Sequence, residues 1–122
     1  MHYVVLRHET PPGASRGSHW DLMLEVDPVA DLRTWAIELP PDSTTAQLAL
    51  ALPDHRREYL TYEGPVSGNR GSVARWDEGT YEVLPPPSDK PDAFVVRVAG
   101  RRLCGIVTIT AGEALRYAYR AE

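Results

Sequence analysis

Short hydrophobic runs separated by turn-forming residues set the pattern of this sequence. The runs are five to eight residues long and rich in Val, Ile, Leu, Tyr and Trp, which is typical of β-strands. We predict strands over residues 3–8, 19–25, 34–38, 46–52, 72–76, 80–84, 93–98, 103–110 and 115–119. Many short strands at this spacing favour an antiparallel β-barrel or sandwich, so we expect a mainly all-β fold with one or two short helical turns.

Proline and glycine punctuate these runs. Turns are predicted at Pro11–Gly13, Pro40–Asp42, Gly68–Gly71, Glu78–Gly79 and Pro85–Pro87. Helix signals are confined to residues 54–62 and 27–32, each of which allows one short turn. The segment that follows the prolines of residues 85–91 is too short to fold alone, so we expect one domain over residues 1–122.

The charge balance narrows the classes of partner. Thirteen basic and seventeen acidic side chains give the 122 residues a net charge of -4. A protein that held duplex DNA through a broad phosphate-binding face would be basic, so any nucleic-acid role must depend on a local site. The single cysteine, Cys104, excludes an internal disulfide, and no segment approaches the ~18 apolar residues of a membrane span. We therefore expect a cytoplasmic protein without a membrane partner.

The segment His19–Glu25 places candidate chemistry on one side of a predicted strand. Successive side chains of a strand point to opposite faces of its sheet. The face that we expect to join the core carries Trp20, Leu22 and Leu24. His19 and Asp21 share the other face, roughly 7 Å apart along the strand, within reach of one metal ion.

His8, at the end of the first predicted strand, is a third candidate ligand. If that strand pairs with the strand of residues 19–25, His8 completes a set of two histidines and one aspartate. Two neutral imidazoles and a carboxylate suit Mn²⁺, Fe²⁺ or Zn²⁺ and leave coordination positions for water or substrate. The residues alone leave a hydrogen-bonding trio without metal as the other interpretation.

A second candidate element is the segment Asp54–Tyr59. On a helical turn His55 and Tyr59 would lie on one face, where imidazole and phenol could donate to an anionic oxygen or act as general acid. Arg56 and Arg57 could bind phosphate through their planar guanidinium groups. The alternative for this segment is a solvated polar turn.

A series of sequence blocks resembles a known family in its order. The blocks are Tyr3–His8, His19–Glu25, Thr34–Ile37, Asp54–Tyr59, Tyr62–Gly64, Trp76–Glu82 and Gly100–Gly105. Each block is short, and it is their shared order over about residues 3–110 that is specific. On these blocks the chain resembles the 3′-phosphoesterase domain of bacterial DNA ligase D, as a divergent and stand-alone member.

The resemblance implies a small antiparallel β-barrel and a Mn²⁺-dependent hydrolase. The family removes a terminal ribonucleoside and then the 3′-phosphate from DNA ends during non-homologous end joining. By resemblance, the metal ligands are His8, His19 and Asp21, with Zn²⁺ or Fe²⁺ as alternative ions. His55 and Tyr59 match the residues that contact the scissile phosphate and assist catalysis. The implied partners are nucleic-acid 3′ ends and a DNA ligase or polymerase.

The chain departs from the family at its cationic phosphate contacts. The positions where the family has Arg, Lys and Arg hold Met23, Leu39 and Gln47. Phosphoester hydrolysis needs positive charge near the developing anion, so other cations must compensate if the activity persists. Arg16, in the loop between the two histidines, is the best candidate, and Arg56 and Arg57 are weaker ones.

Three functions follow from these residues. The first is the metal-dependent phosphoesterase. The second is a binding module that keeps the ion and recognises DNA ends without hydrolysing them, which the missing cations favour. The third is an Fe²⁺ oxygenase, because His19, Asp21 and a later His55 have the order of a facial triad.

Overall fold

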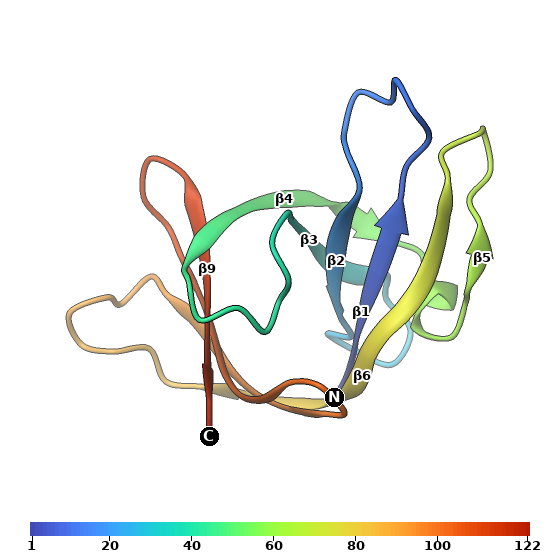
Figure 1. Cartoon of the computed structure of the whole chain (residues 1–122). Coiled ribbons are helices and arrows are strands. Elements are labelled where there is room, and N and C mark those ends of the chain that lie inside the picture. The colour runs from blue at the N-terminus through green and yellow to red at the C-terminus, as the bar shows by residue number, and fades with distance from the viewer.

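The computed structural model describes residues 1–122 and consists almost entirely of antiparallel strands (Figure 1). The strands are β1 (His2–Glu9), β2 (His19–Leu24), β3 (Leu32–Ile37), β4 (Gln47–His55), β5 (Gly64–Pro65), β6 (Ser72–Leu84), β7 (Phe94–Gly100), β8 (Cys104–Thr110) and β9 (Leu115–Ala121). One 3-10 turn, η1 (Arg57–Leu60), is the only helical element. The prediction of a mainly all-β fold is confirmed.

The nine strands form one sheet that closes on itself in a ring. Their order is β1-β2-β3-β4-β9-β8-β7-β6-β5, and β1 also pairs with β6. The seam between β4 and β9 is short, because only Gln47–Ala49 pair with Leu115–Tyr117. The β1–β2 and β5–β6 loops project from the same end of the ring (Figure 1). No helix here has the length and apolar character needed to cross a bilayer.

The predicted turn at Glu78–Gly79 is wrong. β6 runs unbroken through these residues, and the sheet accommodates its bend by a register shift opposite Val5 and Leu6. Gly79 instead allows a close approach between strands, since a Cβ atom there would lie 2.0 Å from the carbonyl oxygen of Ala99. The glycine that sequence analysis interpreted as a turn signal is instead needed for the close packing of β6 against β7.

The helical predictions also need correction. Only Arg57–Leu60 of the segment 54–62 is helical, because β4 extends as far as His55. Residues 27–32 contain no helix. Their loop is held by Asp27, whose Oδ1 atom accepts hydrogen bonds from the backbone amides of Val29 (2.8 Å) and Ala30 (2.6 Å).

Hydrophobic residues cover both faces of β1 and β2. The larger core lies inside the ring and includes Leu22, Leu24 and Trp35, with Trp20 packed against it. On the opposite face a smaller cluster forms beneath η1 and β5. Its buried members are Val4, Leu6, Met23, Leu32 and Val73, and Tyr59, Leu60 and Val66 pack against them. The face that carries His19 and Asp21 is therefore covered by the segment that follows β4.

Candidate metal centre

The pairing of β1 with β2 brings the three predicted metal ligands together. His8 stands directly opposite His19 in the register. Nδ1 of His8 lies 3.6 Å from Oδ2 of Asp21, and Nε2 of His19 lies 3.1 Å from Oδ1. The candidate ligand atoms of all three residues lie within 4.8 Å of one another. His19 and Asp21 are 3% and 2% exposed, so bulk water contributes little to the site.

Hydrogen bonds fix which nitrogen of each imidazole faces the carboxylate. Nε2 of His8 lies 2.8 Å from the carbonyl oxygen of Arg70, and Nδ1 of His19 lies 2.8 Å from that of Gly17. A carbonyl oxygen only accepts, so each of these nitrogens carries a hydrogen. In the neutral rings the lone pairs are then on Nδ1 of His8 and Nε2 of His19, which both face Asp21.

The negative charge of the Asp21 carboxylate favours a bound cation. Burial raises the pKa of Asp21, but the hydrogen bonds that His19 and His8 donate when their rings are protonated outweigh this effect and lower it to about 2. The carboxyl group is thus ionised at neutral pH. With both imidazoles neutral, its buried Oδ1 atom has no hydrogen-bond partner. Two lone pairs and an unsatisfied carboxylate oxygen therefore converge, which fits a divalent metal ion.

Two hollows meet at this cluster. The first has a volume of about 660 Å³ and is bounded by the β1–β2 loop, including Arg16. The second has a volume of about 470 Å³ and extends toward Tyr59 and Arg56. The residues that line both hollows are His8, Asp21, Pro53, His55 and Arg70. A ligand in either hollow can therefore reach the cluster.

The predicted catalytic pair lies beside the cluster. His55 is the last residue of β4 and Tyr59 belongs to η1, so a strand end and a 3-10 turn present them rather than a helix. Their ring centroids are 5.9 Å apart in an edge-to-face arrangement. Nδ1 of His55 lies 2.9 Å from the carbonyl oxygen of Pro53 and therefore carries the hydrogen, which leaves Nε2 free.

The predicted phosphate-binding arginines separate into two groups. Arg16 lines the first hollow and takes part in no ion pair. Arg56 lines the second hollow, where its Nε atom pairs with Glu58 at 3.0 Å. Arg57 lines neither hollow and faces away from the cluster, toward Glu25. The fold therefore does not bring Arg57 to the cluster, and its phosphate-binding role stays a prediction that its position does not support.

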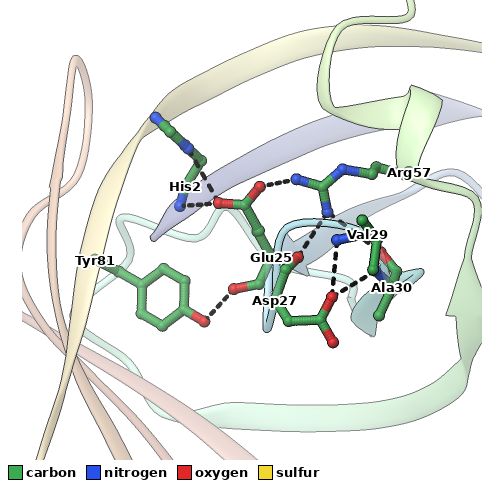
Figure 2. A network of polar contacts seen from close by, with 7 residues as sticks. All are labelled: His2, Glu25, Asp27, Val29, Ala30, Arg57 and Tyr81. Carbon is green, nitrogen blue, oxygen red and sulfur yellow. Dashed lines mark hydrogen bonds and ion pairs between the residues drawn. The ribbon is translucent and has the colours of Figure 1, made fainter.

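Arg57 instead belongs to a structural network (Figure 2). Its Nη2 atom donates to Oε2 of Glu25, and its Nη1 atom donates to the carbonyl oxygen of Asp27 at 2.8 Å. The other carboxylate oxygen of Glu25 accepts from the backbone amide of His2 at 3.2 Å. The carbonyl oxygen of Glu25 accepts from the Tyr81 hydroxyl at 2.5 Å. This network attaches η1 to the loop between β2 and β3.

The positions that replace the family's cations do not supply charge to the cluster. Met23 is 1% exposed and packs in the smaller hydrophobic cluster. Leu39 and Gln47 lie in a third hollow of about 680 Å³, which shares only Arg16 and His19 with the first. The side-chain amide of Gln47 bonds the backbone of Leu39, through Oε1 at 2.8 Å and Nε2 at 3.0 Å. Its role is to close the loop before β4.

Sequence reasoning missed Arg70. This residue lines both hollows, and its carbonyl oxygen orients His8. The available signal was its position inside the predicted Gly68–Gly71 turn, which marked the segment as a turn without indicating its neighbours. Contact with His8 spans 62 positions along the chain, so no local motif records it.

Fold and site together define a small antiparallel β protein with a His-His-Asp cluster where two hollows meet. The family model of the DNA Ligase D 3′-phosphoesterase domain matches residues 10–111. The multifunctional non-homologous end joining DNA repair protein LigD of Mycobacterium tuberculosis is 34% identical over 109 residues, covering 84% of this chain and 13% of that protein. The multifunctional non-homologous end joining protein LigD of Mycolicibacterium smegmatis is 32% identical over 116 residues, covering 84% and 14%.

The chain therefore belongs to the family of DNA ligase D 3′-phosphoesterase domains. It spans about one-eighth of the length of the curated relatives that it matches, since the match covers 13% to 14% of each.

Proposed function

We propose that this chain is a metal-dependent phosphoesterase that trims the 3′ ends of DNA in end-joining repair. Family membership supports the reaction class. The observation that carries the proposal is the orientation of the two imidazoles. Each uses one nitrogen to bond a backbone carbonyl and presents the other to Asp21, whose buried oxygen has no hydrogen-bond partner.

His8, His19 and Asp21 would hold the ion, which we propose to be Mn²⁺, with Zn²⁺ or Fe²⁺ as alternatives. When bound, such an ion supplies Lewis-acid polarisation of a phosphoryl oxygen and lowers the pKa of a bound water. The near-complete burial of His19 and Asp21 strengthens charge interactions at this point, because little water screens them.

The flanking residues supply proton transfer and orientation. Nε2 of His55 makes no hydrogen bond with the protein: in the neutral ring it accepts, and in the protonated ring it can donate a proton or a hydrogen bond to a phosphate oxygen or a leaving group. The Tyr59 ring packs against His55 and restricts its orientation. Arg16 and Arg56, on the walls of the two hollows, offer guanidinium donors to an anionic substrate.

We propose nucleic-acid 3′ ends as the substrate class and a DNA ligase or polymerase as the functional partner. In the relatives named above, the matching region is 13% to 14% of a protein described as a multifunctional end-joining protein. We extend the role in end joining, which the names of these relatives state, to this chain. A cytoplasmic location accompanies it, because end joining acts on the chromosome.

The test compares phosphate release from a 3′-phosphorylated oligonucleotide with Mn²⁺ and with a chelator. We expect Mn²⁺-stimulated release by the unmodified protein and loss of at least about 100-fold in rate for His19→Ala, since one metal ligand is removed. Arg97→Met is the control, because Arg97 pairs with Glu82 and Glu122 at the exposed surface and lines neither of the two hollows. Unchanged release by His19→Ala would rule out the assigned mechanism.

A binding module without hydrolysis is the second candidate function. Its support is the structural role of Met23 and Gln47, neither of which brings positive charge to the cluster. A protein that retains Mn²⁺ and binds 3′ ends without turnover would establish this function. The predicted oxygenase triad used His55, whereas the ligand set that assembles contains His8 in its place. That set is still two histidines and one carboxylate, so it is the family match that favours the phosphoesterase over an oxygenase.

A further inference from the structure

Arg70 lies in a tightly folded turn beside the metal cluster. The turn joins β5 to β6 and contains three residues with positive φ: Gly68 (74°), Asn69 (54°) and Gly71 (94°). A Cβ atom at Gly71 would lie 1.9 Å from the carbonyl oxygen of Glu9, so the turn packs directly on the end of β1. The backbone of Arg70 is therefore held next to His8 by the fold itself.

The guanidinium group of Arg70 is anchored along one edge. Nε donates to the carbonyl oxygen of Ser67 at 2.6 Å, and Nη2 donates to the Ser67 hydroxyl at 3.1 Å. Nη1 has no acceptor, so the edge formed by Nη1 and Nη2 remains available. No carboxylate neutralises the group, whereas Arg56 on the neighbouring wall pairs with Glu58. An anchored guanidinium with a free edge is arranged to bind an anion at low entropic cost.

Arg70 lies where the two hollows meet at the cluster. Arg70 is the only lysine or arginine among the five residues that line both hollows. Its carbonyl oxygen also accepts the hydrogen bond from Nε2 of His8. A single residue thus orients one metal ligand through its backbone and leaves a cationic side chain beside the same hollows. Arg16, the substitute expected from sequence, has no such anchor: it lines the first hollow but makes no hydrogen bond.

We propose that Arg70 is the phosphate-binding cation of this site. Its free edge forms paired hydrogen bonds to the oxygens of a terminal phosphate monoester on a nucleic-acid 3′ end, replacing positive charge that Met23 cannot provide. This inference rests on the proposed function for the identity of the substrate. The inference goes beyond the proposed function because it assigns recognition of the terminal phosphate to one residue.

The test measures binding rather than turnover. Fluorescence anisotropy compares a 3′-phosphorylated oligonucleotide with the same strand ending in a 3′-hydroxyl, and a separate titration measures Mn²⁺ affinity. Arg70→Met removes the charge at similar length, Arg70→Lys keeps the charge without the fork, and Arg101→Met is the control. Arg101 is exposed in the turn between β7 and β8, and the neighbouring Gly100 approaches Tyr3, near the other end of β1 from His8.

We expect Arg70→Met to weaken binding of the 3′-phosphorylated strand about 10- to 100-fold and to leave the 3′-hydroxyl strand and Mn²⁺ affinity unchanged. Arg70→Lys should recover part of the loss, and Arg101→Met should match the unmodified protein. Equal preference for the 3′-phosphate in the Arg70→Met and Arg101→Met proteins would overturn the assignment. So would a loss of Mn²⁺ affinity in Arg70→Met, because Arg70 would then act only through His8.

The two proposals can fail separately. If the protein releases phosphate and Arg70→Met leaves that release and its KM unchanged, the phosphoesterase function stands and the role of Arg70 falls. If the 3′-phosphate preference depends on Arg70 but no phosphate is released, the role of Arg70 stands and the hydrolytic function falls.

Discussion

Asp21 illustrates how a single residue acquires its chemistry from its surroundings. Burial alone would favour the neutral acid, yet the two facing imidazoles keep the carboxyl group ionised, with a pKa of about 2. The reciprocal effect is seen at His8, whose pKa is raised by the hydrogen bond with Asp21 despite partial burial. A proton on His8 and the proposed metal ion would therefore compete for the same nitrogen.

This competition predicts a pH-dependent metal affinity. Because the hydrogen bond with Asp21 raises the pKa of His8, the nitrogen that we propose to bind the metal becomes protonated at a higher pH than in a free imidazole. We expect Mn²⁺ affinity to be constant well above that pKa and to fall as the pH drops through it, with collapse below about pH 6. Calorimetric titrations from about pH 8 to about pH 5.5 measure this dependence. Affinity that is flat over this interval would exclude His8 as a ligand.

At the scale of elements, the site depends on how η1 is fastened to the sheet. η1 is only four residues long and has no side-chain cap, so its own hydrogen bonds hold it weakly. The network around Glu25 and Arg57 supplies the attachment and ties η1 to the β2–β3 loop (Figure 2). Tyr59 of η1 packs against His55 and covers the smaller hydrophobic cluster. Arg57 would therefore be a positioning residue for His55 and Tyr59, the proposed catalytic pair.

Arg57→Met tests whether the attachment of η1 affects catalysis without affecting metal binding. The substitution leaves Glu25, which is 8% exposed, without its cation, so we expect about 1–3 kcal/mol of destabilisation in denaturant unfolding. Phosphate release should slow through kcat while Mn²⁺ affinity is retained, because the cluster lies on β1 and β2.

The matched control for this variant is Arg97→Met. Arg97 pairs with Glu82 and Glu122 at the exposed surface, where water screens an ion pair and its loss changes stability little. Equal stability losses in the two variants would show that the Arg57 network contributes no more than a surface pair.

For the whole molecule, the excess of acidic residues limits how nucleic acid can bind. A net charge of -4 provides no extended attraction for phosphates, so binding must come from the few cations around the two hollows. Arg16, Arg56 and Arg70 are the arginines that line them. The surface that we propose to face DNA is consequently confined to one end of the ring, where the β1–β2 and β5–β6 loops project (Figure 1).

Such a local surface predicts a weak salt dependence. Each phosphate contact on a single strand contributes a slope of about -0.7 to the logarithm of affinity against the logarithm of salt concentration. Two or three contacts give a slope of about -1.4 to -2.1. Anisotropy titrations between low and physiological salt measure it. A slope steeper than about -5 would indicate an extended phosphate-binding surface and contradict this description.

Much of the fold was predictable because strand patterns are local. Alternation in residues 19–25 correctly assigned Leu22 and Leu24 to the core and separated them from His19 and Asp21. The proximity of His8 followed from one further assumption, the pairing of the first two strands, which the register confirms. Gly79 shows the limit of local patterns, because a glycine is required there by the close approach of Ala99 on another strand.

By itself the sequence determined most of the strands and the two faces of β2, because these depend on side-chain periodicity within a few residues. It made His8 the third candidate ligand only on the assumption that the first two strands pair, which the register confirms. Only the tertiary structure decided which arginines lie beside the candidate metal centre. It directed Arg57 to Glu25 and brought Arg70 beside His8 from 62 positions away. The physical reason is that an arginine side chain is long and flexible, so the groups that the folded chain places within its reach decide what it binds. The pattern of residues along the sequence does not show which groups those are.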